Sequence, residues 1–554
     1  MLNATIRRLL RVVTLLTFCA ACGNVLLQVA IGNYDRQIGP LHLVSHGLFK
    51  PLQLLVGAFL LALFVPPRLA SGVAARLPRD SRRRAAAWFL TIATAASILY
   101  LPSFGINFHD NDWTAHRIAA SLTSVSSFVH QFTERQPDGF YRPLLLISLR
   151  LDDAVFGGRL WGYHVQSILL HILNSGLLLL LARETIVPLR AAWWAAALFA
   201  VSPVAFEAVL WPAARGDLLA PAFMLLALLT ALRYLKRDAP AGWRLAGTGA
   251  FYTLALLGKE IAYSFPLLFA IVVVTPTLWG IPPGRRARAV GLAGVVAVVT
   301  AIMLGIRTIV LGGLGGYNET SHIRMGARTL ASLLTRVLTV LPFAVNTSVT
   351  PPIWAKLAIA GFALILAILL AGRASAGTAG LSLIGYALLS ALPAASILAW
   401  IGPTAQHSRY LYWPAVWLML FLSSIIARCR WPDPLFVSLF ALYFAGASYN
   451  LWVYRDMLHR VDTSAEMVAE RCRAQPGVQD VWLGQLPREP NGVFFFASEM
   501  AERIHTKLPG MVVSVSSEPS PPSSANPQER ATFCWSAMDR QLTRCDPSST
   551  PPVN

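Results

Sequence analysis

The sequence predicts an all-α polytopic membrane bundle of about thirteen transmembrane helices, followed by a small C-terminal soluble α/β domain. Three observations lead to this fold class. The 554 residues are 55% hydrophobic and only 13% charged, with a mean hydropathy of +0.55, whereas soluble domains carry about 25% charged residues. Apolar runs of roughly 17–22 residues recur, and the strands of a membrane barrel would be shorter and alternating. No such run follows residue 454, which predicts the soluble domain.

The predicted membrane helices divide the chain into three parts. Residues 1–84 form an N-terminal extension with two helices, residues 85–454 form the transmembrane core, and residues 455–554 form the soluble domain. Each helix is placed by its apolar run. The helices are expected near residues 9–31, 46–65, 85–104, 163–182, 191–209, 217–235, 244–257, 261–280, 289–309, 355–372, 379–400, 410–427 and 433–453.

The basic residues predict the orientation of this bundle. The net charge is +19, but the last hundred residues carry ten Lys/Arg against twelve Asp/Glu, so the excess lies in the membrane part. Much of it sits in short loops at residues 68–84, 233–244 and 285–288. Because basic short loops mark the cytoplasmic side, we expect an inner (plasma) membrane protein with a cytoplasmic N-terminus and an extracytoplasmic C-terminal domain. The charge therefore indicates orientation in the lipid bilayer, with no nucleic acid as partner.

The C-terminal hundred residues have a separate pattern of short elements. Their local periodicity predicts helices and strands in alternation. The helices are expected at Ser464–Arg473 and Ala497–Lys507, and the strands at Val478–Leu483 and Met511–Val515. An extracytoplasmic location permits disulfides, and the simplest one joins Cys534 to Cys545, leaving Cys472 as a thiol.

An acidic cluster, His109-Asp110-Asn111-Asp112-Trp113, follows directly on the apolar run Ala85–Phe104. It opens a long external loop, residues 105–162. Carboxylates at the mouth of a membrane bundle cost free energy to hold near one another, so such residues usually have a function. The alternative is that these are ordinary interfacial residues that cap a helix.

Seven short motifs follow this cluster in order and together resemble one family. They are Phe140-Tyr141-Arg142-Pro143-Leu144, Gly162-Tyr163-His164, Leu170-His171-Ile172-Leu173-Asn174-Ser175, the run from Ser202 to Trp211, Ala214-Arg215-Gly216-Asp217-Leu218-Leu219, Gly258-Lys259-Glu260, and Ser408-Arg409-Tyr410-Leu411-Tyr412-Trp413-Pro414. This set resembles the bacterial relatives of the transmembrane O-mannosyltransferases that carry tetratricopeptide repeats. That family belongs to the GT-C class, polytopic glycosyltransferases that use polyprenyl-phosphate sugars. The resemblance covers roughly residues 85–430, and the family's repeats have no counterpart here.

The resemblance implies a GT-C-like core that transfers a sugar from a polyprenyl-phosphate donor to an extracytoplasmic acceptor, which is a protein, a glycan or a lipid. Inverting transfer requires a base for the acceptor hydroxyl and positive charge for the leaving phosphate. By position, the acidic residues of the family's first external loop match Asp110 and Asp112. We favour Asp110 as the general base, with Asp112 positioning it or holding a divalent metal, the one cofactor considered.

Arg215, Lys259 and Arg409 are the candidate ligands of the donor phosphate. Each lies at the external end of a predicted helix, where a lipid phosphate would sit. The alternative for each one is snorkelling, in which a cation at a helix end reaches the interface without binding a ligand. Three further residues are expected to support the site. Arg142 is expected to anchor the loop, and Asp217 to form an ion pair with Arg215. Glu207 is expected either to pair with Arg215 or to bind a metal.

His164 and His171 are seven residues apart on one helix face, and we interpret them as packing residues with satisfied hydrogen bonds. An alternative function is a transporter or flippase of a lipid-linked glycan, although no paired hydrophobic halves indicate an internal repeat. A third is a noncatalytic scaffold that uses its soluble tail.

Overall fold

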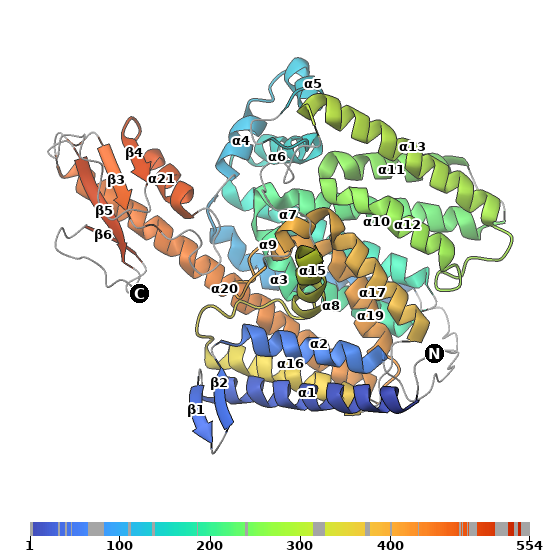
Figure 1. Ribbon diagram of the computed structural model, residues 1–554. Coiled ribbons are helices and arrows are strands. Elements are labelled where there is room, and N and C mark those ends of the chain that lie inside the picture. The colour runs from blue at the N-terminus through green and yellow to red at the C-terminus, as the bar shows by residue number, and fades with distance from the viewer. Residues whose placement is uncertain are drawn as a thin grey trace. The chain divides into compact units, whose positions relative to one another are not determined.

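The structure is a computed structural model of the 554-residue chain (Figure 1). Asp110, Cys545 and the basic loop at residues 68–81 lie outside the residues that it describes. The described residues are 4–31, 34–38, 41–45, 47–64, 82–108, 112–135, 139–185, 187–238, 242–313, 327–371, 377–398, 401–429, 431–475, 478, 480–484, 486, 496–515, 530–536 and 541–544.

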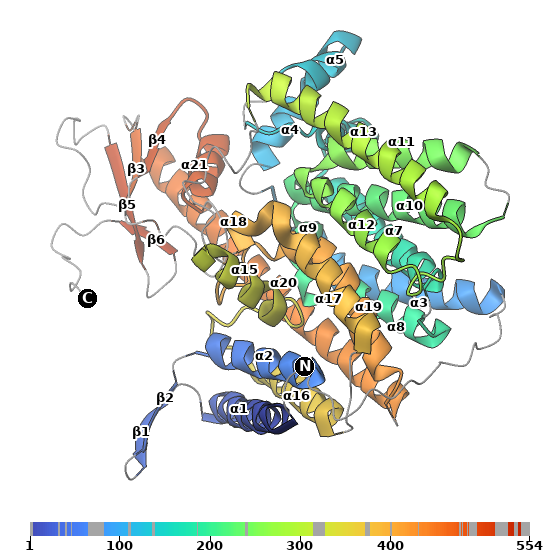
Figure 2. The same cartoon turned by 45° about the vertical axis from the view of Figure 1, so that its right-hand side comes forward.

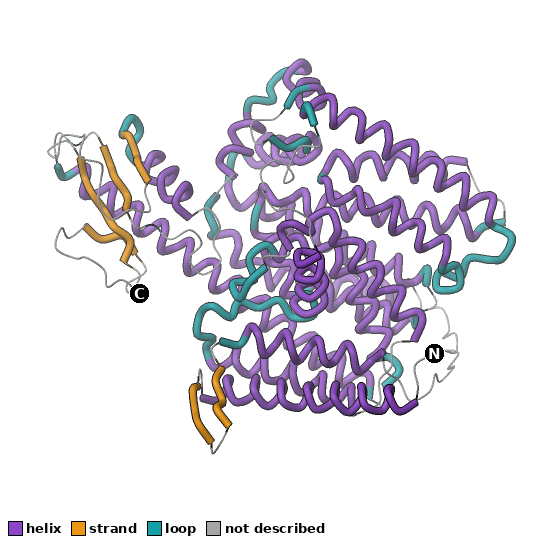
Figure 3. Tube along the Cα trace, viewed as in Figure 1, coloured by secondary structure: helices purple, strands orange, loops and turns teal. Residues whose placement is uncertain are grey.

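Helices make up most of the described chain, as Figure 3 shows by the predominance of purple. Within the described residues, nine are long and apolar enough to cross a membrane, which confirms a multi-pass membrane protein. Each of the thirteen predicted segments overlaps a helix, but the count of thirteen spans stays a prediction. These helices are α1 (Ala4–Ile31), α2 (Phe49–Phe64), α3 (Arg82–Tyr100), α7 (Leu160–Arg183), α8 (Leu189–Ala200), α10 (Gly216–Lys236), α11 (Gly242–Gly258), α12 (Phe265–Val274), α13 (Arg286–Leu311), α16 (Ile353–Ala371), α17 (Gly377–Ala391), α19 (Tyr412–Ile426) and α20 (Pro432–Arg473).

The chain divides into two compact units, the first comprising residues 1–104 and 114–450. Its core is formed by α7, α8, α10 and α19, which pack against one another. Helices that are apolar on every side are expected to be buried, and the residues of α8 and α19 are almost all buried. Helices α1, α2 and α16 lie side by side in Figures 1 and 2, so the N-terminal extension packs on α16.

Short helices interrupt the long ones and form a layer of their own. Proline begins several of them, because its fixed φ suits a first turn and its missing N–H is not needed there. Segment η2 contacts η6, α9 contacts η6, and η4 contacts both η5 and α10. The segments are η2 (Pro203–Ala205), α9 (Phe206–Leu210), η3 (Pro212–Arg215), η4 (Glu260–Ser264), η5 (Leu392–Ala394), α18 (Ala395–Leu398) and η6 (Ser408–Leu411). These segments carry the predicted site residues Glu207, Arg215 and Arg409, and Lys259 directly precedes η4.

The remaining elements of the first unit lie in the long loops and near the N-terminus. Ser124 caps α5 with a reciprocal hydrogen-bonded capping box, which separates α5 from α4. Strands β1 and β2 pair antiparallel. The elements are η1 (Leu101–Gly105), α4 (Asp112–Ala120), α5 (Val125–Thr133), α6 (Pro143–Phe156), α15 (Ala327–Val340), β1 (Tyr34–Ile38) and β2 (Leu41–Ser45).

The second unit comprises Gly105–Trp113 and Leu451–Asn554. It contains a four-stranded sheet in the order β4-β3-β5-β6, with β3 parallel to β4 and β5, and β6 antiparallel to β5. Helix α21 links β3 to β4, as a parallel connection requires. The predicted strands overlap β3 and β4, whereas β5 and β6 were not predicted. The elements are β3 (Asp480–Gly484), α21 (Phe496–Lys507), β4 (Val512–Val515), β5 (Arg530–Ser536) and β6 (Gln541–Arg544).

Helix α20 differs from its prediction. The sequence was divided into a membrane helix ending at residue 453 and a separate tail helix at Ser464–Arg473, but the structure has one helix of 42 residues. No proline or glycine occurs after Gly446 within it, so no residue type interrupts the helical hydrogen bonds. The predicted domain boundary after residue 454 therefore lies inside a helix. In the sheet, Cys534 is disulfide-bonded, while Cys472 is a buried free thiol.

Candidate functional site

The acidic segment belongs to the second unit, together with the C-terminal sheet. Asp110, the favoured base, lies outside the described residues. Asp112 is the first residue of α4, where a carboxylate interacts favourably with the helix dipole, and its side chain is buried. The ring of Trp113 packs edge-on against Phe108, at 5.4 Å between ring centroids.

Arg503 on α21 anchors this segment. Its Nη2 donates a hydrogen bond to the carbonyl oxygen of Phe108 at 2.9 Å, and its Nη1 pairs with Asp462 of α20. The side chain is 2% exposed. Burial lowers the pKa of Arg503 to about 10, an effect that the charges of Asp112 and Tyr454 oppose, so it is a cation at neutral pH. The sequence reasoning missed Arg503, because nothing in an isolated helix with several charges distinguishes this one.

In the first unit, Lys259 and Arg409 each face a buried carboxylate. Lys259 Nζ lies 2.5 Å from Asp217 Oδ2, and Arg409 Nη1 lies 2.6 Å from Glu207 Oε1. Glu207 also accepts the backbone N–H of Arg409 at 3.0 Å, which fixes the start of η6. All four side chains are at least 93% buried, so neither cation simply snorkels to an interface.

The two ion pairs meet on one aromatic ring. Lys259 Nζ and Arg409 Cζ each lie 4.7 Å from the centroid of the Tyr410 ring, so the two cations are at most twice that distance apart. Arg409 also lies over the Trp211 ring at 4.2 Å. Cations over aromatic faces keep their charge available while part of their hydration is lost. The sequence motifs contained both aromatic residues, but only the fold assigns them this role.

Gly216 explains why two of the motifs occur together. A Cβ at Gly216 would lie 3.0 Å from the carbonyl oxygen of Gly258 and 3.4 Å from Cδ of Lys259. A side chain at this position would therefore push η4 away from the start of α10. The glycine thus permits the close approach that brings Lys259 within reach of Asp217.

Arg215 has a different environment from the other two cations. It is completely buried, and its Nη2 lies 2.5 Å from Asp152 Oδ2. Its other donors bind Ser148 at 2.9 Å, the carbonyl oxygen of Tyr163 at 2.8 Å, and Gln166. These contacts join α6, α7 and η3. The expected partner Asp217 instead pairs with Lys259, because the helical start of α10 turns it toward η4.

Arg142 forms a further ion pair, with Glu260, in which the arginine is buried and the carboxylate is 15% exposed. Its Nε donates to Glu260 Oε2 at 3.0 Å and its Nη2 to Oε1, which makes the pair bidentate. The buried Arg307 of α13 also acts electrostatically on Glu260. Arg307 was not among the predicted residues, although an arginine within an apolar run is a signal that could have identified it.

The remaining predicted positions include histidines. His171 is buried, with Nδ1 2.8 Å from the Tyr412 hydroxyl and Nε2 3.0 Å from the carbonyl oxygen of Ala200. These contacts support its interpretation as a packing residue, and His164 is buried as well. Among the described residues, no group of three or more His, Cys, Asp or Glu side chains could hold a metal ion. Asp110 is not part of that set, so a metal at the acidic cluster stays a hypothesis.

Comparison with known proteins confirms the resemblance expected from the motifs. The chain is 32% identical over 215 residues to the protein O-mannosyl-transferase Tmtc2 of Drosophila melanogaster, which covers 36% of this chain and 23% of that protein. It is 34% identical over 185 residues to Tmtc1 of the same organism, covering 31% and 21%. The match thus spans less than a quarter of the relatives' length. No family model matches the chain.

Two solved structures are similar to the chain at low sequence identity. One is ArnT from Cupriavidus metallidurans bound to undecaprenyl phosphate, with a TM-score of 0.44, 14% identity, and coverage of 78% of this chain and 90% of that one. The other is the arabinofuranosyltransferase AftD from Mycobacteria, with a TM-score of 0.40, 14% identity, and coverage of 80% and 32%.

Proposed function

We propose that this protein is a GT-C-type membrane glycosyltransferase, which transfers a sugar from a polyprenyl-phosphate donor to an extracytoplasmic acceptor with inversion. The observation that carries the proposal is the meeting of Lys259 and Arg409 on the Tyr410 ring, within motifs that resemble the O-mannosyltransferases. Two buried cations close together repel one another and cost free energy to desolvate, so their retention favours an anionic ligand.

In this proposal Lys259 and Arg409 bind the donor phosphate. While no donor is bound, Asp217 and Glu207 compensate their charges and hold them in place. Positive charge prepared in a poorly hydrated site stabilises the leaving phosphate without reorganisation during the reaction. Arg142, paired with Glu260 next to Lys259, would anchor the external loop beside them.

Arg215 contributes to this site indirectly. We assign it the task of joining α6, α7 and η3, because its donors already bind Asp152, Ser148, Gln166 and a carbonyl oxygen. The direct phosphate contact expected for Arg215 would require giving up its ion pair with Asp152 together with three further hydrogen bonds. Lys259, by contrast, has Asp217 alone as its ion-pair partner among the described residues.

Asp110 is the proposed base, supported by Asp112. The carboxylate takes the proton of the acceptor hydroxyl as the acceptor oxygen forms a bond to the anomeric carbon of the sugar. The bond between that carbon and the phosphate oxygen breaks, and its electron pair leaves on the polyprenyl phosphate. A base of this kind contributes about 10²–10⁴-fold to the rate.

Sugar transfer by the purified chain in detergent tests the proposal, because detergent removes any contribution from translocation. With a polyprenyl-phosphate sugar and a cell-envelope extract, wild type should transfer sugar. Asp110→Asn should lower turnover by about a hundredfold or more while donor binding is kept. Full activity in both Asp110→Asn and Asp112→Asn would reject an acidic base in this loop. Translocation of a lipid-linked glycan by intact membranes, without transfer in detergent, would favour a flippase.

A further inference from the structure

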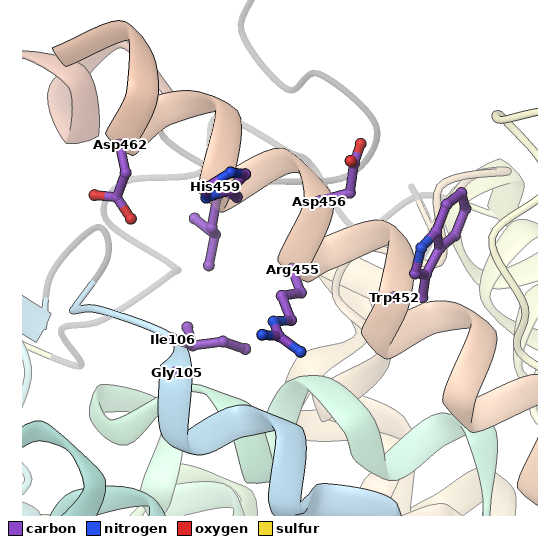
Figure 4. Close-up of a pocket in the computed structure, with 8 residues that line it drawn as sticks. Gly105, Ile106, Trp452, Arg455, Asp456, His459 and Asp462 are labelled. Carbon is purple, nitrogen blue, oxygen red and sulfur yellow. The ribbon is translucent and has the colours of Figure 1, made fainter. Parts of the chain in front are cut away.

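The second unit contains a cavity of about 360 Å³ between α20 and the Gly105–Ile106 segment (Figure 4). This volume is at the lower end of the range for small-molecule sites, about 300–1,000 Å³. The spacing of its lining residues on α20 places most of them on one helix face. They are Trp452, Arg455, Asp456, Leu458, His459 and Asp462.

Within the described part of the chain, one positive charge that lines the cavity has no partner. Asp456 pairs with Arg460 and Asp462 pairs with Arg503, so both carboxylates are already neutralised. The guanidinium of Arg455 has no ion-pair or hydrogen-bond partner among the residues that the structure describes. Figure 4 shows Arg455 reaching from α20 toward Ile106, while the side chain of Asp456 projects in a different direction. The five donors of a free guanidinium match a carboxylate or phosphate.

Gly105 keeps this guanidinium accessible. A Cβ at this position would lie 3.7 Å from Arg455 Nη2, so a longer side chain would occupy the space in front of it. His459 lies one helical turn beyond Arg455 and offers a ring nitrogen as a second donor. The two residues therefore line a site in which an anion is favoured over a cation or a neutral group.

The cavity is close to the proposed base along the chain. Asp110 follows Ile106 by four residues, a stretch that spans at most about 14 Å when fully extended. A ligand bound at Arg455 thus lies within reach of the segment that must contact the acceptor. The donor phosphate is assigned to Lys259 and Arg409, so this second anion belongs to the other substrate.

We propose that the cavity binds an anionic group of the acceptor, a phosphate or carboxylate carried on a sugar or on a lipid head group, with Arg455 as its main ligand. This inference rests on the proposed function for the identity of the ligand as acceptor. The alternative is that Arg455, which follows the apolar half of α20, only extends toward the membrane interface.

Binding of glucose 6-phosphate to the purified full-length protein tests the site without any donor. Isothermal titration in a neutral detergent should show binding to wild type, and none of neutral glucose. Arg455→Gln should weaken binding by about tenfold or more, and Arg455→Lys by less, because the charge is kept but the planar fork is lost. Arg471→Gln, on the same helix but outside the cavity, is the matched control and should bind as wild type does.

A second variant removes access instead of charge. Gly105→Leu should also weaken binding, because its side chain fills the space beside Arg455 Nη2. The proposal is overturned if wild type does not bind glucose 6-phosphate, or if Arg455→Gln binds it equally well. Thermal unfolding of each variant shows whether the fold is kept; Arg455 is exposed, so little change is expected.

Two lipid compositions distinguish the sources of the anion. In phosphatidylcholine nanodiscs, added phosphatidylglycerol should displace glucose 6-phosphate if the natural ligand is a lipid head group, and should leave it bound if the ligand is a soluble glycan. Either result retains the site. Failure of the proposed function has a different signature: Arg455-dependent binding with no sugar transfer. Sugar transfer without any Arg455-dependent binding, and with an unchanged acceptor KM in Arg455→Gln, overturns the site alone.

Discussion

Replacement of Arg503 by Met should release the acidic segment from the C-terminal sheet domain. Methionine has a similar length but removes the charge and all donors. The Phe108 carbonyl then loses a charge-assisted hydrogen bond, which contributes about 1.5–3 kcal/mol. The pair with Asp462 joins α21 to α20, so its loss, about 0.5–1 kcal/mol for a carboxylate that is 39% exposed, affects the domain and not the anchoring of the segment.

The anchoring of the segment therefore loses about 1.5–3 kcal/mol, or about 10- to 150-fold in the equilibrium between the anchored and released segment. Hydrogen exchange followed by mass spectrometry measures this directly, because amide exchange by local opening scales with that equilibrium. Peptides covering residues 105–113 should lose protection by this factor. Peptides covering β3 should change little, which would show that the domain stays folded.

Lys507→Met is the matched control. Lys507 also lies on α21 and pairs with a carboxylate of α20, Glu466, but both groups are partly exposed and contact nothing in the 105–113 segment that the structure describes. No change in exchange at 105–113 is expected. If Arg503→Met leaves protection there unchanged, or if Lys507→Met lowers it equally, the anchoring role is wrong. Turnover should fall in Arg503→Met, stay unchanged in Lys507→Met, and recover in part in Arg503→Lys. The donor KM should change little in all three variants.

Three other predictions test the membrane unit. Lys259→Met should lower sugar transfer by about a hundredfold. The control is Lys236→Met, which breaks a Lys–carboxylate pair at the other end of α10 and should leave sugar transfer unchanged. Equal losses in the two variants would indicate that Lys259 has a structural role alone. Burial, with the charge of Arg409, lowers the pKa of His407 to about 3, so its contribution to stability is present above pH 6.5 and is lost as pH falls toward 3. Across this pH range the thermal unfolding temperature should therefore fall less in His407→Gln than in wild type. Reporter fusions after Asp112 and after Leu458 should both report the extracytoplasmic side, and a cytoplasmic signal at either would contradict the predicted orientation.

The sequence by itself determined the class of protein and the neighbourhood of its site. Apolar runs of membrane-spanning length are a local property, so the helices could be placed without knowing how they pack. The motifs around Lys259 and Arg409 were found in the same way, because charged residues are rare in such runs and therefore conspicuous. The resemblance to the O-mannosyltransferases followed from the order of these motifs.

Only the tertiary structure decided which charges meet. Asp217 was expected beside Arg215, its near neighbour in sequence, but it pairs with Lys259 of a different helix. Asp152 and Arg503 were not predicted at all, because an ion pair depends on the distance between side chains in space and leaves no periodic pattern in the sequence. For the same reason no run of residues indicated that the acidic segment and the C-terminal sheet belong to one compact unit.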